Sequence, residues 1–337
     1  MLTETEIYDL QCIIPLLTKC GLTINWDTDI TVGIYDGDDL VATGSLCANM
    51  IQMVAVDPAY QGTGLSAKIV SLLLSHAYAM HAFPLYLFTK PQAAEQFCAM
   101  GFRMITDASP YCVMLEYGTP GIHEFCNTLN IYRKDGINAA LVMNCNPFTL
   151  GHRYLIEQAV KNTDHVYLFV VQEDRSEIRF EDRLKMVKLG TADLPTVTVI
   201  PGGRYIISSL TFPNYFTKES LLSRAHAHVD ACVFRDHIAP TLGITKRFVG
   251  TEPFSPTTDI YNQELQTVLP IAGIDVICVP RATARGTVIS ASVVRQLMSK
   301  MAYEEMKAFV PKTTWDYLNV ANYIKKPVGI THDNCSR

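Results

Sequence analysis

A regular series of short apolar runs in the second half of the chain limits the possible fold more than any other feature. The runs have strand length, and segments of helical period such as EDRLKMVKLG (181–190) separate them. Because their hydrophobicity is continuous rather than alternating, we expect strands that are buried on both faces. The pattern predicts a doubly wound parallel α/β sheet with its ligand at the carboxyl ends of the strands. The predicted strands are INAALVMN (137–144), HVYLFVV (165–171), TVTVIPG (196–202), KRFVGT (246–251) and DVICVP (275–280).

The first half of the chain has a different pattern, which predicts an α+β domain. A hairpin within 31–47 turns at Asp36-Gly37, and a strand at 50–56 is followed by a helix at about 64–80. A further strand is expected at 85–89 and a short helix at 92–100. The polar stretch NIYRKDGI (130–137) separates the two patterns. A length of 337 residues suits two domains, which we expect at 1–131 and 132–337.

Composition excludes several classes of protein. A hydrophobic fraction of 48% with 18% charged residues is typical of an ordinary folded chain. The net charge of -5 argues against general attraction to nucleic acid or to an anionic membrane. The acidic N-terminus lacks the pattern of a secretion signal and no apolar run has membrane-spanning length, so we expect a cytoplasmic protein. The ten cysteines form no C-x-x-C pair and no cluster of zinc spacing, which predicts reduced, mostly buried thiols and no protein-held metal.

The stretch NPFTLGH directly follows the first strand of the second half. A helix that begins there directs unpaired N–H groups and a positive dipole end towards an anion. Thr149 and His152, three apart in the first helical turn, can face one phosphate, and Gly151 allows close approach of the backbone. His152 would stabilise charge that builds on the α-phosphate as pyrophosphate leaves. The alternative is a tight turn in which His152 is a capping or solvent-facing residue.

A second stretch, RGTVISASVVR (285–295), follows the last strand. Ser290 and Ser292 stand where a helix can start, and Arg295 is one turn further on. Hydroxyls, orphan amides and a guanidinium fork suit the β- and γ-phosphates. Alone, the stretch reads as a Ser-capped amphipathic helix. With the first motif, and in the same order along the chain, it favours a nucleotide site.

The two stretches, TLGH and ISASVVR, resemble the paired T/H-x-G-H and I-S-x-S-x-x-R signatures of the nucleotidyltransferase superfamily. Thr149 replaces the commoner first histidine. The resemblance implies a Rossmann-like second domain that binds ATP, with Thr149, His152 and Arg295 as its catalytic residues. The implied ATP-binding residues are Asn146, Phe148, Thr149, Gly151, His152, Gly250, Glu252, Ser290, Ser292 and Arg295.

In the first half, VAVDPAYQGTGLSAK carries a Q-x-x-G-x-S turn between a strand and a helix. It resembles the pyrophosphate-binding turn of GNAT-type acetyltransferases, whose successive amides cradle a diphosphate. Ser66 stands where that family has Gly or Ala. The resemblance implies a GNAT-like domain that binds a coenzyme A-like arm through Gln61, Gly62, Thr63, Gly64 and Ser66. No general base is evident in this half.

The two halves together are similar to the [citrate (pro-3S)-lyase] ligase family, over nearly the whole chain. GGRYIISSLTFPNYF (202–216) and FVGTEPFSPTTDIYN (248–262) are among the similar stretches. The family resemblance implies an acid–thiol ligase that activates acetate with ATP as acetyl-adenylate, with Mg²⁺ bridging the phosphates. It further implies acetylation of the thiol of a dephospho-coenzyme A-type prosthetic group on the acyl carrier subunit of citrate lyase.

Other residues carry weaker expectations. Arg204, Tyr205 and Ser208 would line an acceptor pocket, and Gly250 and Glu252 would lie beside the ribose or adenine. Arg175, Arg183 and Lys161 are candidates for phosphate contacts, with surface ion pairs or a solvated lysine as the alternative. Alternative functions are an adenylyltransferase acting on a phosphorylated metabolite, an acetyl-coenzyme A-dependent protein acetyltransferase, and a non-catalytic nucleotide-binding regulator.

Overall fold

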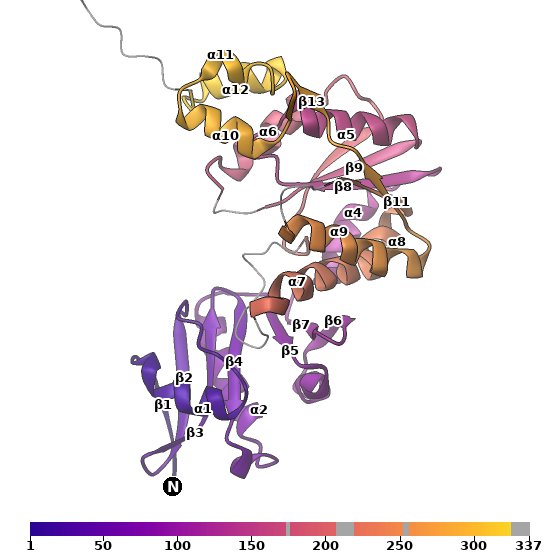
Figure 1. Cartoon of the computed structure of the whole chain (residues 1–337). Helices are drawn as coiled ribbons and strands as arrows, with labels where there is room; N and C mark the ends of the chain where they lie inside the picture. The colour runs from indigo at the N-terminus through magenta and orange to yellow at the C-terminus, as the bar shows by residue number, and fades with distance from the viewer. Residues whose placement is uncertain (173–175, 207–218, 252–255, 325–337) are drawn as a thin grey trace, which may run out of the picture. The chain divides into compact units, whose positions relative to one another are not determined.

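The computed structural model describes residues 1–172, 176–206, 219–251 and 256–324 (Figure 1). Its internal contacts divide the chain into two compact units that interleave along the sequence. Unit 1 comprises Met1–Asp135, Arg204–Lys246 and Glu252–Val276, and unit 2 comprises Gly136–Gly203, Arg247–Thr251 and Ile277–Arg337. The first break between the units falls inside the predicted junction 130–137. The predicted division into two continuous domains at 131/132 stays a prediction.

Unit 1 is built on a seven-stranded sheet with the order β1-β2-β3-β4-β5-β7-β6. Helix α2 packs on this sheet so closely that a Cβ on Gly44 of β3 would lie 2.6 Å from the side chain of Ile69. The strands are β1 (Leu2–Glu6), β2 (Ile30–Asp36), β3 (Asp39–Cys47), β4 (Met50–Val56), β5 (Leu85–Thr89), β6 (Arg103–Ala108) and β7 (Cys112–Tyr117). The helices are α1 (Ile14–Lys19), α2 (Leu65–Ala79), α3 (Ala94–Ala99), α4 (Ile122–Asn130), α7 (Glu219–Val233), a π-helical turn (Phe234–Ile238), α8 (Ala239–Leu242) and α9 (Pro256–Val268).

The sheet of unit 1 opens between β4 and β5. These two strands are parallel and pair at Met50 with Tyr86 and at Ile51 with Leu87, although both strands continue further. All the other strand pairs of this sheet for which the register is known are antiparallel. The carboxyl-terminal parts of β4 and β5 therefore become walls of a cavity, described below.

Unit 2 holds a five-stranded sheet with the order β10-β9-β8-β11-β12. The strands β8, β9 and β10 pair in parallel, and the apolar residues of β8 are almost all buried. In chain order this is the 3-2-1-4-5 arrangement of a doubly wound fold, whose ligand crevice lies where the order reverses, here between β8 and β11. The bounds are β8 (Asn138–Met143), α5 (Leu150–Lys161), β9 (His165–Val170), α6 (Phe180–Gly190), β10 (Val197–Pro201), β11 (Ile244–Gly250) and β12 (Asp275–Val279).

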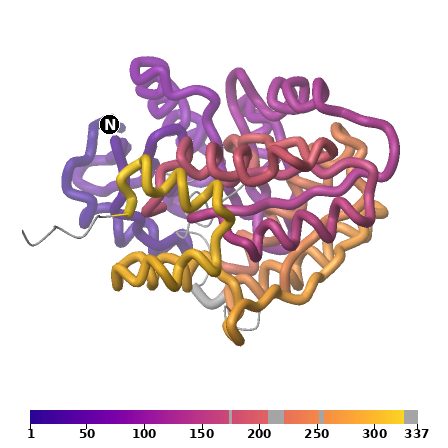
Figure 2. Tube along the Cα trace, turned by 90° about the horizontal axis from the view of Figure 1, so that it is seen from above, coloured from indigo at the N-terminus to yellow at the C-terminus, as the bar shows by residue number. Residues whose placement is uncertain are grey.

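The end of the described chain forms a small hairpin and three helices in unit 2, coloured from orange to yellow in Figure 2. They are β13 (Thr283–Ala284), β14 (Thr287–Val288), α10 (Ala291–Ser299), α11 (Tyr303–Met306) and α12 (Lys312–Val320). Asp182 of α6 anchors this region, because it accepts hydrogen bonds from the hydroxyls of Tyr317 (2.7 Å) and Tyr323 (2.6 Å). These bonds hold the pKa of Asp182 below its usual value against the effect of its burial.

The predicted fold class is confirmed: an α+β first half is followed by a doubly wound sheet. The five predicted strands of the second half correspond to β8 to β12, and the predicted helix at 64–80 is α2 with Gly64 as its N-cap. The expectation of mostly buried thiols is wrong, since Cys12 and Cys278 are exposed and only Cys112, Cys145 and Cys232 are buried among the nine described free cysteines. Across the described residues, no helix combines the length and the apolar character needed to cross a membrane.

Candidate functional site

The loop after β8 ends in a cap that fixes the position of His152. Thr149 is the N-cap of α5, and its Oγ1 accepts a hydrogen bond from the His152 backbone N–H (3.3 Å). In return, the backbone N–H of Thr149 donates to Nδ1 of the His152 ring (3.0 Å). This is a capping box in which a histidine takes the place of the usual Glu or Gln. The Thr149 hydroxyl is thus engaged within the motif, and the phosphate contact predicted for it stays a prediction.

The capping box determines the protonation state of His152. A ring nitrogen that accepts from a backbone N–H carries no proton, so Nδ1 is the acceptor and Nε2 carries the hydrogen. Burial, with a smaller contribution from the charge of Arg281, lowers the pKa of His152 to about 4. The ring also stacks on the buried side chain of Phe148, with centroids 5.9 Å apart and planes at 12°. His152 is therefore a neutral, rigidly held donor at neutral pH.

This protonation state predicts a pH dependence. Between pH 6.5, the ordinary pKa of histidine, and about 4, the unfolded chain binds a proton at His152 that the folded protein does not bind. The contribution of His152 to stability is therefore complete above pH 6.5 and is lost as the pH falls towards 4. We expect the NMR signals of the His152 ring, identified by their absence in His152→Gln, to stay at their neutral positions from pH 8 to about pH 5. A titration midpoint near 6.5 would contradict the assignment.

The second motif lies against the first in unit 2. Ser290 is the N-cap of α10, where its Oγ accepts from the Val293 N–H (3.2 Å). A Cβ on Gly151 would lie 2.7 Å from the backbone oxygen of Ile289, so the missing side chain makes room for the second motif. Arg295 closes the contact, because its Nη1 donates to the backbone oxygen of Asn146 (2.6 Å). The structure thus brings the two distant motifs together, as the nucleotide-site hypothesis requires.

The donors at this junction suit an anion. Of the first amides of α5, that of Leu150 donates to Phe309 (2.9 Å) and that of His152 to Thr149. No described residue accepts a hydrogen bond from Nε2 of His152 or from the backbone N–H groups of Gly151, Ala291 and Ser292. Amides at two helix N-termini, with the Arg295 guanidinium beside them, fit the oxygens of a phosphate chain.

The structure also places three other residues of the predicted ATP site, namely Asn146, Phe148 and Gly250. Asn146 is 8% exposed and its Oδ1 accepts from the Ile178 N–H (3.2 Å). Phe148 has no exposed surface, so its side chain supports the His152 ring from the core. Gly250 ends β11, where an added Cβ would lie 3.9 Å from the side chain of Leu155 in α5. Their predicted nucleotide contacts stay predictions, and Glu252 lies outside the described residues.

The predicted acceptor residues are found in unit 1. Tyr205 is 3% exposed, and its hydroxyl donates to the buried carboxylate of Glu116 (2.7 Å). Its ring packs edge-on against Tyr86 with centroids 5.7 Å apart. Arg204 is exposed, and Ser208 lies outside the described residues. Because Tyr205 is buried and hydrogen-bonded, the structure gives no support to an acceptor pocket lined by its side chain.

Arg183 has a role that the sequence patterns did not indicate. It is fully buried, and its Nη1 donates to the backbone oxygens of Asn144 (2.6 Å) and Val171 (2.8 Å) while Nε donates to that of Ile178 (3.1 Å). The guanidinium thereby joins the segments that follow β8 and β9 at the edge where the predicted site lies. This is neither a phosphate contact nor a surface ion pair.

The other two candidates for phosphate contacts are not near the motif in the described structure. Arg175 lies outside the described residues. Lys161 ends α5, about 14 Å along the helix from His152 at 1.5 Å per residue.

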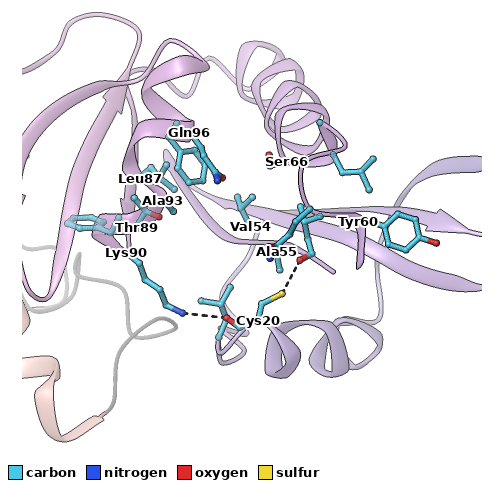
Figure 3. Close-up of a pocket in the computed structure, with 18 residues that line it drawn as sticks. Cys20, Val54, Ala55, Tyr60, Ser66, Leu87, Thr89, Lys90, Ala93 and Gln96 are labelled. Atoms are coloured by element: carbon cyan, nitrogen blue, oxygen red, sulfur yellow. Dashed lines mark hydrogen bonds between the residues drawn. The ribbon is translucent and has the colours of Figure 1, made fainter. Parts of the chain in front are cut away.

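Unit 1 contains a cavity of about 330 Å³ at the opening between β4 and β5 (Figure 3). Gln61, Gly62, Gly64 and Ser66 of the predicted diphosphate turn line it. Gly62 and Gly64 have φ angles of 78° and 83°, so the turn depends on glycine at both positions. Thr63 does not line the cavity, and its hydroxyl donates to the backbone oxygen of Tyr60 in the same turn.

The cavity walls are mostly apolar and carry neither a carboxylate nor an imidazole among the described residues. Val54, Ala55 and Val56 of β4 and Leu87, Phe88 and Thr89 of β5 form an apolar slot, as Figure 3 shows in part. The Lys90 ammonium lies at the wall and donates to the backbone oxygen of Cys20 (3.4 Å). Burial raises the pKa of the Cys20 thiol, which disfavours a reactive thiolate. The described lining includes no carboxylate and no imidazole.

A metal site held by protein side chains is not evident in the described part of the chain, where no three His, Cys, Asp or Glu residues are suitably grouped. The Mg²⁺ predicted from the sequence stays a prediction.

Comparison with known proteins identifies the family. Residues 138–318 match the model of the citrate lyase ligase C-terminal domain. The [Citrate [pro-3S]-lyase] ligase of Haemophilus influenzae is 42% identical over 323 residues, which cover 94% of this chain and 96% of the relative. The predicted family and enzyme class are confirmed by these matches.

Solved structures are more distant. A putative acyl-CoA N-acyltransferase from Klebsiella pneumoniae is 20% identical and covers 34% of this chain and 96% of its own, with a TM-score of 0.29. Thermotoga maritima TmcAL bound with alpha-thio ATP is 13% identical and covers 55% of this chain and 56% of its own, with a TM-score of 0.37. The sequence matches the family model over residues 138–318 and a curated relative over 94% of its length. This chain therefore belongs to the citrate lyase ligase family.

Proposed function

We propose that the protein activates acetate with ATP and transfers the acetyl group to the thiol of a dephospho-coenzyme A-type prosthetic group on the acyl carrier subunit of citrate lyase. The observation that carries this proposal is the donor set of unit 2. The neutral Nε2–H of His152, the amides of two helix N-termini and Arg295 meet where two distant motifs join. Family membership supplies the reaction class. We expect the reaction in the cytoplasm.

The first step is a displacement at the α-phosphorus of ATP. An oxygen of acetate forms a bond to this phosphorus, and the bond to the bridging oxygen breaks, so that pyrophosphate leaves with the electron pair. Acetate is a weak nucleophile, and the protein therefore has to hold both substrates in line. His152 donates a hydrogen bond to the phosphate oxygens and keeps its proton throughout. Mg²⁺ bound to the phosphates would supply further charge neutralisation.

The second step consumes the acetyl-adenylate. The prosthetic-group sulfur bonds to the acetyl carbon, the carbon–oxygen bond to the phosphate breaks, and AMP leaves while the thiol proton passes to solvent. The cavity of unit 1 is our candidate for holding the coenzyme A-like arm of the carrier. Its lining provides glycine amides, Lys90 and an apolar slot, but no carboxylate or imidazole among the described residues. Glu116, at the end of β7, is buried and bonded to Tyr205 and to the Ile122 N–H. We therefore assign binding, not acyl-transfer chemistry, to this unit.

An isotope-exchange experiment tests the first step. With ATP, Mg²⁺ and labelled pyrophosphate, we expect label to enter ATP only when acetate is present. Exchange that requires a phosphorylated metabolite instead of acetate would favour the adenylyltransferase alternative. Acetylation of the carrier from acetyl-coenzyme A without ATP would favour the acetyltransferase alternative. Either result would overturn the proposal.

A pair of glycine variants tests the role of the cavity. Gly64 lines the cavity, whereas Gly37 lies in the β2–β3 turn, and both have positive φ angles (83° and 62°) with no atom within 4 Å of an added Cβ. Leucine therefore causes similar backbone strain at both positions, about 1–2 kcal/mol. We expect Gly64→Leu to lower carrier acetylation at least about tenfold, equivalent to about 1.4 kcal/mol of binding. Acetate-dependent exchange should stay unchanged.

Gly37→Leu is the matched control, and we expect it to acetylate the carrier at the wild-type rate. Equal acetylation by the Gly64 and Gly37 variants would remove the arm from this cavity. Loss of exchange in Gly64→Leu would show that the substitution acts on the whole protein rather than on arm binding.

A further inference from the structure

Arg281 lies in unit 2, directly after β12 and before the β13–β14 hairpin. Its Nε donates to the backbone oxygen of Thr251 (2.7 Å), and the Thr251 N–H donates to the backbone oxygen of Val279 (2.9 Å). Thr251 immediately follows β11, so Arg281 is tied to the ends of β11 and β12 together. Its side chain is partly buried. No sequence motif pointed to this residue.

Two contacts of neighbouring residues and one electrostatic effect place Arg281 near the start of α5. The neighbouring residue, Ala282, accepts a hydrogen bond from the Ile289 N–H (2.9 Å), and Ile289 packs on Gly151. Gly250, next to Thr251, lies beside Leu155 of α5. The charge of Arg281 also acts on His152, where it contributes to the lowered pKa of the imidazole. Arg281 therefore lies near the start of α5, on the β11 side of the crevice between β8 and β11.

The side chains named so far provide little positive charge to balance the phosphates of ATP. His152 is neutral, and Arg295 lies 3.5 Å from the carboxylate of Glu177 and donates to Asn146. Arg295 contacts the segments that follow β8 and β9, whereas Arg281 is held at the ends of β11 and β12. In the strand order β9-β8-β11-β12, the segments that hold the two arginines lie on the two sides of the crevice between β8 and β11.

We propose that Arg281 is a further substrate-binding residue of this site, which contacts the phosphates of ATP from the β11–β12 side and stabilises the charge that builds during pyrophosphate departure. This inference rests on the proposed function and extends it. A guanidinium fork suits two phosphate oxygens at once, and its fixed position avoids reorganisation during the reaction.

Arg281→Gln in the full-length protein tests the inference through the exchange assay. We expect acetate-dependent exchange to fall roughly 100-fold, the usual effect of removing one charge-stabilising donor. The KM for ATP should rise while the KM for acetate stays unchanged. Arg281→Lys keeps the charge without the fork, and we expect it to recover about tenfold of the loss. Lys161→Gln removes a cation from the far end of α5 and should match the wild type.

Several outcomes would overturn the inference. Exchange within twofold of wild type in Arg281→Gln would remove the residue from the site. A rise in the KM for acetate alone would assign the guanidinium to the carboxylate instead of the nucleotide. A lowered melting temperature together with equal losses in Arg281→Gln and Arg281→Lys would indicate a structural role through Thr251.

A separate measurement distinguishes this inference from the proposed function. If the wild type shows no acetate-dependent exchange, the proposed function fails. Equilibrium dialysis with ATP alone still tests Arg281 in that case, and we expect binding to Arg281→Gln to be at least tenfold weaker than to Lys161→Gln. Equal affinities would refute the contact with ATP.

Discussion

We expect His152→Asn to lower acetate-dependent ATP–pyrophosphate exchange about a thousandfold, the upper end of the effect of losing one transition-state donor. The reason lies in the two ring nitrogens. An asparagine Oδ1 can take the place of Nδ1 and accept from the Thr149 N–H, which preserves the capping box. It has no group at the position of Nε2. The variant therefore removes the donor that we assign to chemistry while it keeps the local fold.

His152→Gln is the complementary variant. Its longer side chain can place an amide N–H near the position of Nε2 but loses the acceptor at Nδ1. We expect it to retain more exchange activity than His152→Asn and to be the less stable of the two in thermal unfolding. If His152→Asn keeps full exchange, or if it is the less stable variant, the capping box rather than the Nε2–H is the reason for the histidine.

The second large effect is expected on stability. We expect Arg183→Met to destabilise unit 2 by on the order of 3–5 kcal/mol, because it leaves three carbonyl oxygens in partly or fully buried hydrogen bonds without their donor. The Arg183 guanidinium donates to Asn144, Val171 and Ile178 and is fully buried. These acceptors lie where β8 and β9 end. We therefore also expect the exchange activity to fall, through displacement of the loop that carries His152.

Arg179→Met is the matched control on the same segment, because the Arg179 side chain is 77% exposed, and its buried partner Asp182 keeps the hydrogen bonds from Tyr317 and Tyr323. We expect a change below about 1 kcal/mol there. The chain has 2 tryptophans, so in a Trp26→Phe background the fluorescence of Trp315 reports the unfolding of unit 2 in urea. Similar unfolding midpoints for the two arginine variants would contradict the anchoring role of Arg183.

Much of the architecture could be predicted because buried strands and helix starts require particular residue types at neighbouring positions. The continuous apolar runs predicted β8 to β12, and the glycine at the start of α2 predicted the turn that lines the cavity of unit 1. The spacing of TLGH and ISASVVR predicted two helix starts, and both Thr149 and Ser290 are indeed N-caps. Each of these features depends on residues within one or two turns of each other.

The sequence could not predict which groups of the site bond within the protein and which remain as donors. The sequence offered Thr149 and His152 as ligands of one phosphate, with capping as the alternative for His152. The structure shows that the cap uses the hydroxyl of Thr149 and the Nδ1 of His152, which leaves Nε2 of His152 as a donor. Tyr205 follows a strand of the second sheet and was expected at its ligand edge. It instead packs in unit 1 beside Glu116, because the segment 204–246 belongs to that unit.

The sequence by itself determined the strands of the second sheet, the positions of the two motifs and the family. The tertiary structure decided which donors remain available to an anion and which are used by the protein. Arg183 and Arg281 illustrate the reason, since both are arginines in polar stretches and neither has a distinctive spacing. Apart from Ile178, which is 5 residues from Arg183, their partners lie 12 and 39 residues away for Arg183 and 30 residues away for Arg281. The packing of the sheet rather than local periodicity brings these distant partners together.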